Sequence, residues 1–306
     1  MAKKKPKPTA YERHKERARS RQESQSREGR DIAPLPKIAS PKRRKTASKS
    51  LEAFCLTYAP SVFFLPFSAD HRKVIQKLEV AVKDGGQFGV AMPRESGKTS
   101  LCLFAALWAV LYGYRKFVVL IGANESKAGQ LLEDIQEVLQ SSPDLIADFP
   151  ESVYPFSLIG NTPQKARGQL HDGELTNISI KEGRIQFPKI PKSKASGARL
   201  VITGLTGGGI RGLHKIGPDG SWDRPDLVIL DDPQTDQSAR SREQNRVIVK
   251  LISGAVLGMG GAHGKRIACV MPCTVIEPGD AVEQMLELPK WEAERCQRMY
   301  AFPANT

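Results

Sequence analysis

The stretch QFGVAMPRESGKTS, at residues 87–100, decides the expected fold, because an apolar run is followed at once by a polar turn and a helical pattern. The run predicts a strand over Gln87–Met92, and the residues after the turn predict a helix over Lys98–Tyr112. A strand, a turn and a helix in this order form the repeating unit of α/β folds. The rest of the chain continues the alternation, so we expect an α/β domain with a mainly parallel central sheet flanked by helices.

Further apolar runs predict strands over Lys116–Ile121, Arg199–Thr203, Asp226–Leu230 and Lys265–Val270. Helical patterns cover Ala69–Lys83, Glu125–Gln140, Ala239–Leu257 and Gly279–Leu288. The segment NISIKEGRIQF, residues 177–187, predicts a β-hairpin that turns at residues 181–183.

Within the polar turn, Gly97, Lys98 and Thr99 match the end of the Gly-x4-Gly-Lys-[Ser/Thr] phosphate-binding loop. Met92 stands where that pattern has its first glycine. In such a loop, backbone N–H groups bind phosphate oxygens, Lys98 offers a point charge and Thr99 offers a hydroxyl to Mg²⁺. Arg94 adds a cation near a γ-phosphate, or is a surface arginine. A solvated turn is the alternative, which the flanking strand and helix disfavour. The predicted nucleotide-binding residues are Pro93, Arg94, Glu95, Ser96, Gly97, Lys98, Thr99 and Ser100.

Two carboxylates, Asp231 and Asp232, follow an apolar strand, at the end where open α/β sheets bind ligands. Asp231 is predicted to hold Mg²⁺ through water, and Asp232 to orient or deprotonate the attacking water. Taken alone, an Asp-Asp-Pro turn explains the pair equally well. Thr274 ends another strand and would lie beside the nucleotide if the two strands are neighbours. Arg211 lies among glycines that would let it approach a polyanion, or in a flexible surface loop.

The 306 residues carry 46 Lys+Arg and 33 Asp+Glu, a formal net charge of +13. Residues 1–50 hold 17 of the basic and 5 of the acidic residues, so the remaining body is nearly neutral. This segment has few large apolar residues, which predicts a mostly disordered basic tail whose densest cluster is residues 42–45. The tail either contacts nucleic-acid phosphates in a salt-sensitive way or is merely solvated.

Membrane and secreted classes are not expected. The longest unbroken apolar run, Leu101–Tyr112, has 12 residues, which is too short to span a bilayer. The N-terminus is charged from Lys3 onward, with no apolar stretch behind it that would indicate a secretory signal. Five scattered cysteines without a CxxC pair indicate a reducing compartment.

In this order, the motifs resemble the ATPase domain of tailed-bacteriophage terminase large subunits, which are DNA-packaging motors. The resemblance covers about residues 66–288 and rests on residues 91–99, 209–213, 226–233, 239–246 and 273–280. It implies a P-loop NTPase fold with ATP and Mg²⁺ as ligands. It implies catalytic roles for Asp232, Arg94, Lys98, Arg211 and Thr274, with Thr99 and Asp231 at the metal.

The resemblance also implies partners: double-stranded DNA, the small terminase subunit, the portal protein of the procapsid and a homo-oligomeric ring, a pentamer when assembled, in the host cell cytoplasm. Candidates for an arginine that acts on a neighbour's nucleotide are Arg211, Arg240 and Arg242. The family's C-terminal nuclease is not expected, because 26 residues follow Asp280. The expected division is a basic tail at 1–50, an ATPase domain at 51–290 and the start of a linker at 291–306.

Three departures from the family pattern stand out. Glu95 lies where many terminases have a small residue or glycine, and Asp232 lies where motor ATPases frequently have the longer Glu. No upstream glutamine matches the family's adenine contact, which leaves His71 and Gln76 as candidates. Two alternatives stay open: a helicase-like ATPase stimulated by nucleic acid, and a non-catalytic nucleic-acid-binding protein with a structural nucleotide fold.

Overall fold

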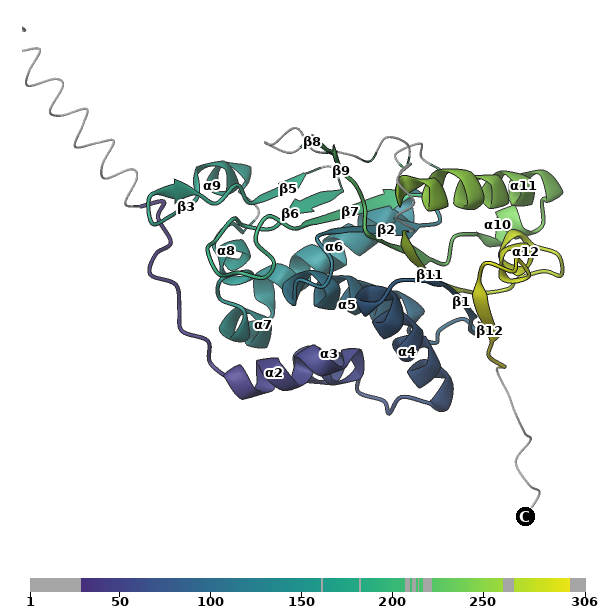
Figure 1. The fold of residues 1–306 in the computed structure, drawn as a ribbon, viewed down its shortest axis with the longest axis horizontal. Coiled ribbons are helices and arrows are strands. Elements are labelled where there is room, and N and C mark those ends of the chain that lie inside the picture. Colours follow the sequence, from purple (N-terminus) through teal and green to yellow (C-terminus); the bar gives the residue numbers. More distant parts are fainter. Residues whose placement is uncertain are drawn as a thin grey trace, which may run out of the picture.

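The computed structural model describes residues 29–160, 162–181, 183–206, 210, 213, 215–216, 222–260 and 267–297. Its centre is an eight-stranded sheet in the order β12-β1-β11-β10-β2-β7-β6-β5 (Figure 1). The parallel strands are β12 (Glu292–Arg295), β1 (Gln87–Ala91), β11 (Ala268–Cys273), β10 (Leu227–Asp231), β2 (Phe117–Gly122) and β7 (Arg199–Gly204). The antiparallel hairpin of β5 (Ser179–Lys181) and β6 (Arg184–Gln186) completes it. The predicted fold class, a mainly parallel α/β sheet flanked by helices, is confirmed.

Helices cover both faces of the parallel part of the sheet (Figure 1). One face carries α3 (Leu51–Tyr58), α4 (Ala69–Lys83), α5 (Lys98–Leu111) and α6 (Glu125–Ser141). The other carries α11 (Arg242–Lys250), a π-helical segment (Leu251–Val256), a 3-10 turn (Leu257–Gly260) and α12 (Ala281–Leu286). Successive residues of β2 alternate between the two cores: Val118 packs into the first and Val119 into the second. Helix α5 is apolar all round because it lies between the sheet and the outer helices α3 and α4.

Shorter elements complete the described chain. They are α2 (Pro41–Lys49), α7 (Pro143–Asp148), α8 (Tyr154–Ser157), α9 (Pro163–Gly168), α10 (Asp236–Ala239), β3 (Leu170–His171), β4 (Glu174–Leu175), β8 (Lys215–Ile216) and β9 (Trp222–Asp223). Within the described ranges, no helix is both long and apolar enough to cross a membrane.

The prediction of a disordered tail over residues 1–50 is wrong for residues 29–50; residues 1–28 lie outside the described residues. Residues 41–49 form α2, which begins with a Ser40 cap and packs Ala47 into the core. Its carbonyls accept hydrogen bonds from core aromatics: Trp108 Nε1 donates to Ala47 O at 3.0 Å, and Tyr112 Oη donates to Arg44 O at 2.7 Å. Residues 29–50 are therefore part of the folded body.

Ion pairs explain why composition misled the prediction. Arg43 Nε lies 2.6 Å from Asp148 Oδ2, and Asp148 is fully buried at the end of α7. Arg44 pairs with Glu151, and its guanidinium lies 4.4 Å from the centre of the Phe149 ring. A basic stretch that is poor in apolar residues becomes ordered when distant carboxylates compensate its charge. No local sequence pattern contains that information.

Other boundaries also differ from the predictions. The predicted strand Lys265–Val270 lies later, at Ala268–Cys273, and the predicted helix Ala239–Leu257 is replaced by α10, α11, the π-helical segment and the 3-10 turn. The domain end predicted at residue 290 is wrong, because β12 pairs with β1 and belongs to the sheet. The hairpin at residues 177–187 is confirmed.

Candidate nucleotide site

The phosphate-binding loop joins the carboxyl end of β1 to the start of α5. Gly97 caps α5 with a φ of +72°, a left-handed conformation that glycine adopts at little cost. The cap makes no side-chain hydrogen bond, so the first N–H groups of α5 are left to a ligand. Glu95 also has a positive φ, +61°, which is costly for a residue with a side chain. The loop therefore holds the shape that an anion site at a helix start requires.

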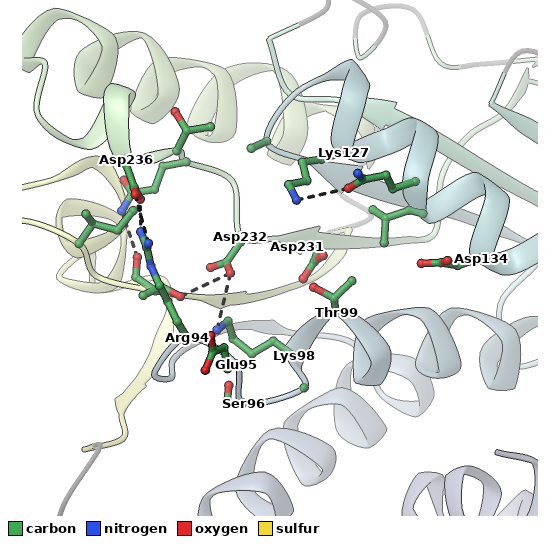
Figure 2. Close-up of a pocket in the computed structure, with 18 residues that line it drawn as sticks. Arg94, Glu95, Ser96, Lys98, Thr99, Lys127, Asp134, Asp231, Asp232 and Asp236 are labelled. Atoms are coloured by element: carbon green, nitrogen blue, oxygen red, sulfur yellow. Dashed lines mark hydrogen bonds and ion pairs between the residues drawn. The ribbon is translucent and has the colours of Figure 1, made fainter. Parts of the chain in front are cut away.

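Lys98 lies inside this loop and points across the site. Its side chain is 4% exposed, and Nζ donates to Pro93 O at 2.9 Å. The same Nζ lies 3.6 Å from Asp232 Oδ2 (Figure 2). The ammonium is thus held between the loop's own carbonyl and the acidic strand end.

The carboxylates at the end of β10 reach the same place. Asp231 is buried beside Thr99 (Figure 2), and burial, reinforced by neighbouring Asp232, raises the pKa of Asp231 to about 6 against the opposing Thr99 hydrogen bond and Lys98 charge. Asp231 Oδ1 is buried and has no hydrogen-bond partner among the described residues. An orphaned carboxylate oxygen next to a hydroxyl suits a hard cation that binds oxygen ligands. The residues present therefore fit Mg²⁺, which Asp231 and Thr99 would hold.

Asp232 and Thr274 meet because β10 and β11 are neighbours. Asp232 has a φ of +41°, and its N–H donates to Pro272 O of β11 at 3.2 Å. Thr274 Oγ1 donates to Asp232 Oδ2 at 3.4 Å. The Asp232 carboxylate lines the cavity, and its side chain is 39% exposed. Contacts with residues at the end of β11 hold it in place.

Arg94 makes an ion pair that the sequence did not suggest. Its guanidinium hydrogen-bonds both carboxylate oxygens of Asp236 on α10 (Figure 2). The bonded Asp236 carboxylate raises the pKa of Arg94, and the guanidinium in turn lowers the pKa of Asp236. Both side chains are more than half exposed at the rim of the cavity.

These groups line one cavity of about 480 Å³. Its lining residues are Arg94, Glu95, Ser96, Gly97, Lys98, Thr99, Ala123, Lys127, Gln130, Leu131, Asp134, Asp231, Asp232, Gln234, Thr235, Asp236, Thr274 and Ile276. The sequence reasoning missed the contribution of α6, where Lys127 and Asp134 lie across the cavity from the loop (Figure 2). The sequence contained a signal for this contribution. The parallel strand β2 ends at the same sheet edge, and Asn124 caps the helix that follows it, so the start of α6 is expected near the ligand.

Several predicted residues lie elsewhere. Pro93 contributes only its carbonyl to Lys98, and Ser100 does not line the cavity. His71 Nε2 lies 2.8 Å from Ser96 O and supports the loop, while Gln76 is exposed on α4 and does not line the cavity. The remaining candidates are the three arginines that were expected to act on a neighbour's nucleotide. Arg240 Nε lies 3.4 Å from Glu277 Oε1, and Arg242 is exposed on α11. Arg211 lies outside the described residues.

A buried polar network connects the acidic end of β10 to the neighbouring loops. Gln234 Nε2 donates to Thr274 O at 3.1 Å and to Asp280 Oδ2 at 2.6 Å, while its Oε1 accepts from Val282 N at 3.3 Å. Asp280, 1% exposed, also caps α12 by accepting from Glu283 N at 2.9 Å. The loop after β10 is thus bonded to the loop after β11 and to the start of α12.

Together, the mainly parallel sheet and the loop between β1 and α5 at its carboxyl edge have the arrangement of a P-loop α/β domain. No protein family matches the sequence, and no curated protein matches it. The solved structures that are similar to the chain include two phage large terminases. The HK97 bacteriophage large terminase has 14% identity and a TM-score of 0.45, over 78% of this chain and 40% of that one. A mutant of the large terminase ATPase domain of Thermus phage P74-26 has 12% identity and a TM-score of 0.43, over 78% of this chain and 84% of that one.

Proposed function

We propose that this chain is the ATP-hydrolysing motor domain of a phage terminase large subunit, which translocates double-stranded DNA into a procapsid. One observation carries the ATPase part: at the carboxyl edge of the sheet, Lys98 and Thr99 at the start of α5 and Asp231 and Asp232 at the end of β10 line one cavity. The ordered motifs of the sequence support the terminase part. The proposed partners are DNA, the small subunit, the portal and further copies of the chain in a ring, and the proposed location is the host cytoplasm.

In this mechanism the loop N–H groups and Lys98 bind the ATP phosphates. Lys98 exchanges its bond to Pro93 O for phosphate oxygens, where its charge offsets the negative charge of the transition state. Mg²⁺, held by Thr99 and by Asp231 through water, would neutralise phosphate charge.

Asp232 orients the attacking water and accepts its proton, and the Thr274 hydroxyl positions that carboxylate. Arg94 leaves Asp236 to add a second cation. Arg211, Arg240 or Arg242 of a neighbouring copy is the proposed source of a third.

The test compares ATP hydrolysis by wild type, Lys98→Ala and Asp232→Asn, each with and without double-stranded DNA. We expect both variants to lose hydrolysis by at least a hundredfold, and DNA to stimulate the wild type but neither of these variants. Asp84→Asn, an exposed carboxylate at the end of α4, is the matched control and should behave as wild type. Wild-type rates in Lys98→Ala would overturn the ATPase assignment. Hydrolysis that DNA never stimulates would overturn the motor assignment alone.

A further inference from the structure

The antiparallel end of the sheet carries a second cavity, distant in sequence from the phosphate-binding loop. It has a volume of about 640 Å³ and lies over β5, β6, β7 and the start of β2. Its floor includes Phe117 and Val201, which belong to the core on the α11 face of the sheet. The polar side chains that line it are Asn177, Ser179, Lys181, Arg184, Gln186, Lys189 and Arg199.

Strand alternation places the cations of this cavity side by side. Ile185 of β6 turns into the first core, so Arg184 and Gln186 on either side of it face the cavity. In the register of the hairpin, Lys181 lies directly opposite Arg184. Like charges directly opposite each other in an antiparallel pair are destabilising. An anion bound beside both cations would offset this repulsion.

The charge of this cavity is unbalanced within the described residues. Lys181, Arg184 and Lys189 are exposed, none of them makes an ion pair with a described residue, and no described lining residue is a carboxylate. Glu182, at the turn of the hairpin, lies outside the described residues. Arg199 is oriented by its Nε bond to Gln186 Oε1 at 3.2 Å and lies 5.6 Å from the centre of the Phe117 ring. The result is a basic face at the antiparallel end of the sheet.

We propose that this hairpin face, Ser179, Lys181, Arg184 and Lys189, binds the phosphate backbone of double-stranded DNA. The identity of the polyanion rests on the proposed function. Cations with hydroxyl and amide neighbours match phosphate oxygens, which give affinity without sequence preference. Surfaces for single strands need exposed aromatic rings on which bases stack. The aromatic ring in this cavity, Phe117, is 4% exposed and lies under Arg199, so the face favours a duplex.

The experiment measures binding of a fluorescent 30-base-pair duplex to the full chain by anisotropy at several salt concentrations. The double variant Lys181→Gln/Arg184→Gln should bind the duplex at least tenfold more weakly at about 0.1 M salt. The negative slope of the logarithm of the association constant against the logarithm of the salt concentration should become shallower by about 1.8. The matched control is Arg246→Gln/Lys250→Gln, which removes the same charge from the exposed side of α11.

Basal ATP hydrolysis without DNA should be unchanged in both double variants, so a failure of the hairpin face is distinguishable from a failure of the ATPase assignment. The hairpin variant should be at least as stable to heat as wild type, because a repulsive pair is removed. Equal DNA affinity of the hairpin variant and the control would overturn the proposal. A single-stranded probe that binds more tightly than the duplex, with the same loss in the variant, would overturn the choice of duplex.

Discussion

Replacing Asp148 with asparagine should lower the free energy of unfolding by about 3 kcal/mol, because Asp148 fastens the N-terminal segment to the body. Its side chain is fully buried. Oδ1 accepts from Ser40 N at 2.9 Å, while Oδ2 accepts from Arg43 Nε at 2.6 Å and from Tyr58 Oη at 2.9 Å. An amide keeps the shape of the carboxylate but turns an NH₂ group toward at least one of these donors. It also leaves the Arg43 guanidinium without its buried counter-charge.

The magnitude follows from the burial of one partner. Breaking a buried ion pair by removing one charge costs about 3–5 kcal/mol. The low end applies here because the Arg43 side chain is 35% exposed and water can take over part of its solvation. For a domain of this size, about 3 kcal/mol corresponds to a decrease of roughly 6–12 °C in the melting temperature. Urea unfolding followed by circular dichroism, together with a thermal melt, measures both quantities.

Asp144→Asn is the matched control, because it removes the same charge from the same arginine. Asp144 Oδ1 lies 3.0 Å from Arg43 Nη2, but its side chain is 47% exposed. An ion pair this exposed contributes less than about 1 kcal/mol. If the two variants differ in stability by less than 1 kcal/mol, then the buried carboxylate does not hold α2, and the account of the ordered N-terminal segment is refuted.

Three further predictions concern the cavity. Because burial raises the pKa of Asp231 to about 6, its favourable contribution is complete below about pH 4 and is lost as the pH rises through 6. The free energy of unfolding of Asp231→Asn, measured by urea unfolding in EDTA without nucleotide, should therefore exceed that of the wild type by roughly 3 kcal/mol at pH 8 and by about half of that at pH 5. A gain that does not depend on pH would contradict this prediction. Gln234→Glu places a second carboxylate beside Asp280. Urea unfolding should therefore show a loss of about 2 kcal/mol or more in the free energy of unfolding, and ATP turnover should fall. An unchanged free energy of unfolding would mean that the buried network does not stabilise the fold. Asp236→Asn should leave the free energy of unfolding nearly unchanged, since both side chains of the Arg94 pair are more than half exposed. The substitution should tighten ATP binding relative to ADP in a fluorescent-nucleotide titration, and weaker ATP binding would show that Arg94 does not contact the phosphates.

The strands and their chemistry were largely predictable, because the relevant patterns are local. Helix α4 begins and ends at the predicted residues, and the loop at residues 93–99 lies between β1 and α5 as expected. The meeting of Asp232 with Thr274 followed from a rule about parallel strands, once their two strands were taken as neighbours. By contrast, Asp236 and Lys127 reach the cavity from separate helices, and no spacing in the sequence connects either residue to the loop.

The sequence by itself determined the α/β alternation, the phosphate-binding loop and the carboxylates at a strand end, since each depends on residues close together in the chain. Only the tertiary structure decided that α2 is ordered, because its Arg43 and Arg44 pair with Asp148 and Glu151, about 105 residues away. The same holds for the hairpin face, where cross-strand register sets Lys181 opposite Arg184. Charge composition says how much charge a segment carries. The electrostatic energy of that segment depends on which charges the fold brings within a few ångströms of it and on how much water remains between them.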